Sequence, residues 1–317
     1  MIKNKLYNIA PVAIFAYNRP DHFSKTINSL SKCLGFGSGP ITVYIDGPKN
    51  SDDKTKISRV KSLAHRCFGG LAEIKCRPSN MGLAQSITKG VKEQLDRYGT
   101  VIVIEDDLTL DKKFLIFMSM ALNRYANEDR VFQISGYSYI SSNLLDSNNA
   151  FFLPLTTTWG WATWSRAWKS YDHKAVNWHL LEEDYDLRNN FNLGGAYDYA
   201  TMLEKQMNKN IDSWGIRWYW SVFKKNGIVL FPPNSLVINN GMDGTGSHGS
   251  GLLTNFRGTI KSENFMTPNL PDAINVNQSE FSIVKKAIWK QNGGYLRWII
   301  DRVKIFAKFI KHLFTRN

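Results

Sequence analysis

The sequence has few cysteines and no long apolar run. Its three cysteines, Cys33, Cys67 and Cys76, are odd in number and lack the spacing of a metal site. We therefore expect neither a disulfide framework nor a cysteine-bound metal, and a reducing cytoplasm is the simplest compartment. No apolar stretch reaches the roughly 18 residues of a membrane span, and residues 1–7 lack the apolar core of a signal peptide. These absences predict a cytoplasmic protein.

Acidic residues are outnumbered, with 27 Asp and Glu against 40 Lys and Arg, for a net charge of +13. The excess is concentrated at the C-terminus, where residues 285–317 carry nine Lys or Arg against one acid, Asp301. A nucleic-acid-binding protein would more often distribute its basic residues over the face of its core fold. We therefore expect no nucleic-acid partner.

The basic C-terminal segment also has the pattern of an amphipathic helix. Its apolar residues recur at helical spacing, at Ile299, Val303, Phe306, Ile310 and Leu313. A basic, aromatic-rich helix of this kind favours binding at the anionic inner face of a cell membrane. The alternative is an ordinary terminal helix that packs on the protein core.

Strand and helix patterns alternate through the first hundred residues. No Gly-x-Gly-x-x-Gly follows the first strand, which argues against a dinucleotide site. Repeated strand–helix units predict an α/β fold with a mainly parallel, doubly wound sheet. The predicted strands are 11–16, 41–45, 72–77, 101–104, 131–136, 150–153 and 228–233. The predicted helices are 22–34 (with Asp21 as N-cap), 51–66, 83–98, 178–185 and 197–209.

The most informative segment is Val101-Ile-Val-Ile-Glu-Asp-Asp-Leu108, where a buried strand leads directly into three carboxylates. At the carboxyl end of a parallel strand they would face the crevice where open α/β sheets bind ligands. Three adjacent like charges call for a counterion, and oxygen ligands suit Mg²⁺ or Mn²⁺. The alternative is a solvated acidic turn that caps the next helix.

The second half of the chain is rich in tryptophan. Residues 156–171 contain four tryptophans and residues 210–220 contain three more, a density that suits sugar binding but is also common in protein cores. Five glycines in 240–251 predict a mobile lid. We interpret 1–275 as one catalytic domain, with a nucleotide-sugar half to about residue 107 and an acceptor half from 108, and 276–317 as a basic appendage.

Six landmarks in order carry a resemblance to a known family. They are Ala16-Tyr-Asn-Arg-Pro20, Ile45-Asp-Gly47, Glu105-Asp-Asp-Leu108, Gly160-Trp161, Asp212-Ser-Trp214 and Gly246-Ser-His-Gly249. With these motifs, over roughly residues 10 to 250, the chain resembles GT-A glycosyltransferases. It is most similar to the N-acetylglucosaminyltransferase I family and to bacterial surface-polysaccharide glycosyltransferases. The resemblance implies a Rossmann-like mixed sheet flanked by helices, and a hexosyl- or N-acetylhexosaminyltransferase that inverts the anomeric centre.

The resemblance also implies roles for individual residues. Arg19 would approach the donor nucleotide or diphosphate, and Asp46 would accept a hydrogen bond from uracil of a UDP-sugar. Asp107 would contact Mn²⁺ or Mg²⁺, Asp106 would face the ribose, and Glu105 would lie near the sugar. The remaining implied site residues are Asp212 as general base, His248 in a loop that closes over the donor, and Trp159, Trp161 and Trp214 at the acceptor.

Several alternatives remain open at this stage. Asp212 could instead be the N-cap of the next helix, and Asp184 and Asp186 are competing bases. Ser213 stands where the family has a second carboxylate. The acceptor is expected to be a glycan or a lipid-linked oligosaccharide in bacterial surface-polysaccharide assembly. Other classes of protein to consider are a nucleotidyltransferase that makes nucleotide-sugars and a non-catalytic carbohydrate-binding protein.

Overall fold

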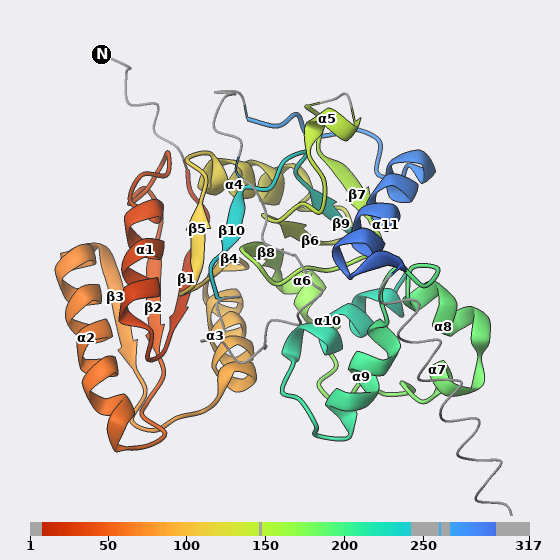
Figure 1. Cartoon of the computed structure of the whole chain (residues 1–317). Helices are drawn as coiled ribbons and strands as arrows, with labels where there is room; N and C mark the ends of the chain where they lie inside the picture. Colours follow the sequence, from red (N-terminus) through yellow and green to blue (C-terminus); the bar gives the residue numbers. More distant parts are fainter. Residues whose placement is uncertain (1–7, 146–147, 242–259, 261–266, 296–317) are drawn as a thin grey trace, which may run out of the picture.

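The computed structural model describes residues 8–145, 148–241, 260 and 267–295 (Figure 1). Within these ranges, eight strands form one sheet in the order β3-β2-β1-β4-β8-β6-β9-β7, and β5 pairs with β10 in a second sheet. The strands are β1 (Val12–Ala16), β2 (Ile41–Ile45), β3 (Ala72–Cys76), β4 (Thr100–Glu105), β5 (Leu108–Leu110), β6 (Val131–Ser135), β7 (Phe151–Leu153), β8 (Trp161–Trp164), β9 (Ile228–Phe231) and β10 (Val237–Asn239).

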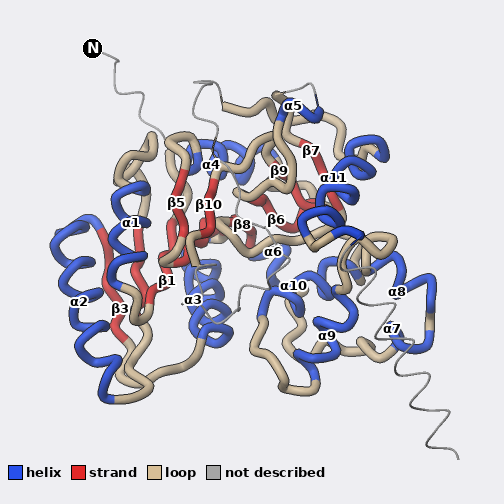
Figure 2. The backbone as a smooth tube through the Cα atoms, viewed as in Figure 1, coloured by secondary structure: helices blue, strands red, loops and turns tan. Residues whose placement is uncertain are grey.

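Helices surround the large sheet (Figure 2). They are α1 (Pro20–Leu30), α2 (Ser51–Phe68), α3 (Leu83–Tyr98), α4 (Phe114–Arg124), α5 (Ser142–Leu145), α6 (Ser165–Trp168), α7 (Leu180–Glu183), α8 (Tyr185–Phe191), α9 (Tyr199–Met207), α10 (Trp214–Phe223) and α11 (Gln278–Gln291), with a short 3₁₀ turn at Gly69–Leu71. None of the helices in the described ranges is long and apolar enough to cross a bilayer.

The order of the strands reverses beside β1. This strand pairs in parallel with β2 on one side and with β4 on the other, and β3 continues in parallel beyond β2. The chain therefore builds outward from β1 to β3 and then crosses to the opposite side of β1 for β4. Where the order reverses in this way, the loops after the two neighbouring strands diverge and leave a crevice at their carboxyl ends.

The large sheet is mixed, which confirms the predicted fold class. β8 runs antiparallel between β4 and β6, and β7 runs antiparallel to β9, whereas β6 and β9 are parallel. β8 is not among the strands that the sequence predicts. All four residues of β8 are buried, and α4 and α6 pack on this strand.

Only the predicted helix 83–98 has the same bounds in the structure, and two of the other four need a correction. α1 begins at Pro20 after Arg19 as the N-cap, so the prediction of Asp21 as N-cap was wrong. Proline suits the first helical position because its missing N–H has no partner there in any helix. The predicted helix 178–185 is divided into α7 and α8, and Asp184 caps α8 by accepting a hydrogen bond from Leu187 N at 2.9 Å.

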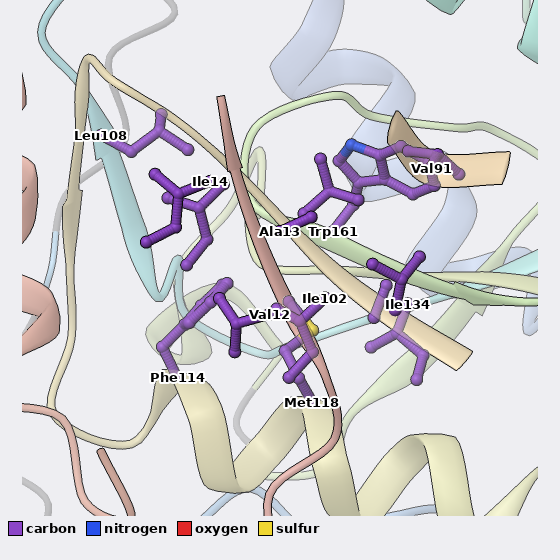
Figure 3. Packing of buried hydrophobic residues seen from close by; sticks show 14 of the residues in the cluster. Val12, Ala13, Ile14, Val91, Ile102, Leu108, Phe114, Met118, Ile134 and Trp161 are labelled. Carbon is purple, nitrogen blue, oxygen red and sulfur yellow. The ribbon is translucent and has the colours of Figure 1, made fainter. Parts of the chain in front are cut away.

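Both faces of the central strands are covered by helices. α3 packs on β1 and β4, and α4 packs on β4, β6 and β8. As a result Val101–Ile104 are completely buried, and Ile102 lies among Val12, Met118 and Ile134 (Figure 3). Burying each such side chain stabilises the fold by roughly 1.5–3 kcal/mol. This rigid centre holds the ends of β1 and β4 in place.

The first part of the predicted appendage belongs to the domain. α11 inserts Val284 and Ile288, both fully buried, into a second core cluster that includes Val229 and Phe231 of β9. The amide of Gln291 donates a hydrogen bond to the Tyr139 carbonyl at 2.8 Å. α11 therefore packs on the core formed by the preceding residues, within the stretch 276–317 that the sequence assigns to an appendage. The predicted amphipathic helix over 299–313 lies outside the described residues.

Candidate functional site

Arg19 and the acidic triplet meet where the strand order reverses. Arg19 follows β1, and Glu105, Asp106 and Asp107 end β4 or follow it directly. One guanidinium nitrogen of Arg19 pairs with Asp106, and the other lies 3.0 Å from Asp107 Oδ2. Tyr17 N also donates to Asp106 at 3.3 Å. The fold thus places a cation and three carboxylates in the crevice that binds ligands in open α/β sheets.

The electrostatics of this cluster depend on burial. Burial, followed by the charges of Asp107 and Asp106, raises the pKa of Glu105 to about 8. For Arg19, burial opposes ionisation, but the carboxylates of Asp106 and Asp107 outweigh it and raise the pKa. A single guanidinium balances only part of the negative charge. The cluster is therefore able to accept a further cation.

The end of β10 closes one side of the cluster. Asn240 N donates to the Asp107 carbonyl at 2.8 Å, and the Asn240 side chain donates to Thr109 Oγ1 at 2.9 Å. Gly241 lies directly against the Asp107 carboxylate, and a Cβ built at Gly241 would overlap Asp107 Oδ2. A larger residue at position 241 would therefore force the Asp107 and Arg19 side chains to shift. His248, which the sequence placed at the donor, lies outside the described residues.

A divalent metal fits this cluster only together with a ligand. Among the described residues, no three His, Cys, Asp or Glu side chains converge in a way that could hold a metal ion. The Asp107 side chain is 13% exposed, whereas that of Asp106 is 4% exposed and paired with Arg19. Mg²⁺ commonly takes one or two protein carboxylates and completes its shell with water and substrate phosphates. The carboxylate oxygens present are of the right chemical type for such a site.

Asp46 is engaged by its own protein. Its buried carboxylate accepts hydrogen bonds from Gly47 N at 2.9 Å, Met81 N at 3.0 Å, Asn80 Nδ2 at 3.1 Å and Gly82 N at 3.1 Å. A carboxylate offers about four lone-pair positions. The loop before α3 therefore occupies all the acceptor positions of the Asp46 carboxylate, which the sequence predicts to bind uracil.

The loop that Asp46 holds ends beside Asp212. A Cβ at Gly82 would lie 3.8 Å from Asp212 Oδ2. Ser213, not Asp212, caps α10 by accepting a hydrogen bond from Ile216 N, so the alternative of Asp212 as N-cap was wrong. The Asp212 side chain is 64% exposed, and its Oδ1 lies 3.9 Å from Arg217 Nη2. Asp212 is thus an accessible carboxylate between the two halves of the domain.

The tryptophans predicted at the acceptor are mostly core residues. Trp161 is fully buried and stacks on Trp214, which is 3% exposed, at 5.1 Å between ring centroids. An enclosed ring cannot stack on a sugar, so the acceptor assignments of Trp161 and Trp214 are corrected. Trp159 is half-buried and packs edge-on against Tyr137 at 4.7 Å. It is the one predicted acceptor ring with an accessible part.

Sequence reasoning missed a second hydrogen-bonded group near Arg19. Tyr17 OH donates to Asp53 at 2.5 Å, and Asn18 Nδ2 donates to the other oxygen of the same carboxylate at 2.6 Å. Tyr17 and Asn18 belong to the motif that contains Arg19, which was the available signal. Their partner Asp53 lies 35 residues away from Asn18 in the chain. Such a pairing cannot be inferred from spacing.

Comparison with solved structures gives distant likenesses. No protein-family model matches the chain. GalNAc-T7, solved with UDP, GalNAc and Mn²⁺, is 10% identical with a TM-score of 0.44, covering 71% of this chain and 42% of that one. The mannosyltransferase PcManGT from Pyrobaculum calidifontis, in complex with GDP-Man and Mn²⁺, is 10% identical with a TM-score of 0.33, over 50% and 45%. S. aureus TarS is 13% identical with a TM-score of 0.29, over 40% and 21%. The chain spans less than half the length of each.

Proposed function

We propose that this protein is a metal-dependent glycosyltransferase of the GT-A fold that uses a nucleotide-sugar donor. The observation that carries the proposal is the pairing of Arg19 with Asp106 and Asp107 where the strand order reverses. A guanidinium beside several carboxylates suits a metal-bound diphosphate, because the guanidinium attracts phosphate oxygens and the carboxylates attract the metal. The resemblance of the sequence motifs points to the same activity. GalNAc-T7 and PcManGT are described with such ligands.

At the donor, Asp107 would hold Mn²⁺ or Mg²⁺, which offsets negative charge on the departing diphosphate. The Arg19 guanidinium would shift part of its interaction from Asp107 to the diphosphate. Asp106 would keep the guanidinium oriented. Glu105 lies at the end of the same strand and would face the sugar, with His248 closing over the donor. Asp46 would hold the loop at Asn80–Gly82, since contact with uracil would require that loop to give up a hydrogen bond. A UDP-sugar remains the first donor to test.

At the acceptor, Asp212 would act as the general base. The acceptor hydroxyl oxygen attacks the anomeric carbon, the bond from that carbon to the diphosphate breaks, and Asp212 takes the hydroxyl proton. This single displacement inverts the anomeric centre. The exposure of Asp212 supports the role, because a base must reach the acceptor. Asp184 is the weaker candidate because its carboxylate caps α8, and Asp186 lies on the exposed surface of that helix. Trp159 would contribute to acceptor contact.

The acceptor would be a glycan, carried on a lipid at the inner face of the bacterial cell membrane, in surface-polysaccharide assembly. The support is the basic, aromatic pattern of residues 296–317, which suits peripheral binding to anionic lipid. A chain ending at residue 295 should lose binding to vesicles that contain anionic lipid and keep its activity on soluble acceptors. Unchanged vesicle binding would contradict the membrane role.

The test of the function is thermal stabilisation by UDP-, GDP-, dTDP- and CMP-sugars, with and without Mn²⁺. A ligand at about 100 times its dissociation constant stabilises a protein by about 2.7 kcal/mol. We expect Mn²⁺-dependent stabilisation by one nucleotide-sugar, and we expect Asp107→Ala to abolish it. Asp186→Ala, which removes an exposed carboxylate on α8, is the matched control.

Three results would lead elsewhere. Release of pyrophosphate from a nucleoside triphosphate and a sugar phosphate would identify a nucleotidyltransferase. Metal-independent glycan binding without nucleotide affinity would identify a carbohydrate-binding protein. Equal stabilisation of Asp107→Ala and the wild type by nucleotide-sugar and Mn²⁺ would show that Asp107 is not the metal ligand.

A further inference from the structure

A cavity lies at the C-terminal end of α10, at the opposite end of this helix from Asp212. It is a pocket open to solvent, with a volume of about 690 Å³, between Pro154 after β7, the α7–α8 segment, α10 and α11. Figure 1 shows α8, α10 and α11 side by side in this part of the molecule. The volume is within the range of small-molecule sites. Because α10 rises about 1.5 Å per residue, roughly 15 Å separates the cavity from Asp212.

Four asparagine side chains line this cavity, at Asn177, Asn189, Asn190 and Asn226. All four residues are exposed, and within the described part of the chain none of their side-chain amides has a protein partner. Each amide offers one acceptor oxygen and two N–H donors. The lining thus offers amide donors and acceptors that no other side chain of the described residues occupies.

Apolar rings form another part of the wall. Phe223 and Trp220 of α10 stack with their centroids 5.9 Å apart, and Phe281 of α11 is also in the lining. Lys285 Nζ lies 4.8 Å from the Phe281 ring centre, whereas Lys224 is already bonded to Asp172. No Asp or Glu is among the described lining residues. The lining therefore disfavours cations and combines ring faces with amides.

The backbone around the cavity is held in a costly conformation. Asn177, Leu193 and Asn226 have φ of 66°, 55° and 50°, and all three line the cavity. Asparagine tolerates this left-handed region, but a leucine there is strained because its Cβ approaches the following carbonyl oxygen. The Leu193 side chain is buried in the second core cluster, and Gly194 continues the left-handed turn at φ 70°. Non-glycine residues in this region cluster at functional sites.

We propose that this cavity is an accessory glycan-binding site, which holds an oligosaccharide through the four asparagine amides and the Phe223 and Phe281 rings. An asparagine amide can donate a hydrogen bond to one sugar hydroxyl and accept one from its neighbour. The faces of aromatic rings pack on the apolar C–H faces of a sugar. The hydrocarbon tail of a lipid would leave most of these amides without partners. Under the proposed function, the site would hold a distal part of the acceptor chain while its end reaches Asp212.

The experiment measures binding of cellohexaose, maltohexaose, chitotetraose and tetragalacturonate to the full chain, without nucleotide or metal, by saturation-transfer NMR and calorimetry. The test variant combines Asn177→Gly, Asn189→Ala, Asn190→Ala and Asn226→Gly. Glycine at 177 and 226 keeps the positive φ while it removes the amide. The control is Asn28→Ala with Asn208→Ala, two exposed asparagines away from the cavity.

We expect at least one oligosaccharide to bind, and the fourfold variant to bind it at least about tenfold more weakly, which corresponds to about 1.4 kcal/mol. The control should bind as the wild type does. No binding by any of the four glycans, or equal binding by the fourfold variant and the wild type, would overturn the proposal. Asp107→Ala should keep glycan binding, so failure of the donor site and failure of this site are separable.

Discussion

Two buried carboxylates in the first half of the chain organise loops. Asp46 holds the loop before α3, and Asp53 ties the segment after β1 to α2 through Tyr17 and Asn18. The hydrogen bonds from Tyr17 and Asn18 lower the pKa of Asp53. Burial, followed by the hydrogen bond to Asp53, raises the pKa of Tyr17 to about 12. Both shifts keep Tyr17 as the donor and Asp53 as the charged acceptor at neutral pH.

This pair predicts a pH-dependent contribution to stability. A carboxylate with a lowered pKa stabilises the fold above its unfolded pKa, and that stabilisation is lost as the pH falls through the folded pKa. Asp53→Asn should therefore cost about 1.5–3 kcal/mol at pH 7, the usual range for hydrogen bonds to a charged group. The cost should shrink toward zero below pH 3.8, the ordinary value for this carboxyl. Urea unfolding of both proteins at pH 7 and pH 3 measures it.

The neighbouring Asp52 provides the control, because it is exposed at the start of the same helix. Asp52→Asn should change the free energy of unfolding by less than about 1 kcal/mol, the usual size of a helix-dipole effect. An equal loss for Asp53→Asn at both pH values would show that the carboxylate charge is not the cause.

Among the elements, α9 is followed by a non-glycine residue, Lys209, in a left-handed backbone conformation. Lys209 follows the helix with φ 61°, and Asn210 N donates to the Lys205 carbonyl at 2.8 Å to close the last turn. A glycine is the usual residue at this position because it has no Cβ to clash. The exposed lysine side chain therefore adds strain to the end of α9 without burying any surface.

Lys209→Gly should stabilise the protein by roughly 0.5–1 kcal/mol. The estimate is the relief of about 1–2 kcal/mol of left-handed strain, less the greater freedom of glycine in the unfolded chain. Lys205→Gly makes the same change inside α9 and should instead destabilise by about 1 kcal/mol. Chemical denaturation of the two variants gives the comparison, and a loss of stability in Lys209→Gly would refute the strain argument.

For the whole molecule, α11 joins the C-terminal segment to the domain. The second core cluster draws residues from β7, β9, α8, α9, α10 and α11, so it forms only when distant parts of the chain meet. Ile288 lies in that cluster with no exposed surface. The stability of this half should therefore depend on the helix that the sequence pattern assigned to an appendage.

Ile288→Ala should destabilise the protein by about 2–5 kcal/mol, the range for removing a large aliphatic side chain from a core. Lys286→Ala, on the exposed surface of α11, should change stability by less than about 0.5 kcal/mol. The measurement is the free energy of unfolding by denaturant. A small effect of Ile288→Ala would mean that α11 docks weakly and that the boundary at 275 is the better description.

The sequence alone determined the elements with the strongest local patterns. Apolar runs bounded by turns placed β1, β2, β4 and β9 almost to the residue, because buried strands need continuous apolar side chains. The motifs around Arg19 and the acidic triplet also located the candidate donor site. Strands that alternate with helices form a parallel sheet, and the carboxyl ends of its strands meet at one edge.

Only the tertiary structure decided what each of those side chains contacts. It assigned Asp46 to the loop at Asn80–Gly82, Trp161 to the core, and Ser213 rather than Asp212 to the cap of α10. It also brought four asparagines from three separate segments to one cavity. Local patterns report whether a residue favours burial, a turn or a helix end. Which partner satisfies it depends on pairings between residues far apart in the chain, and those exist only after the layers have packed.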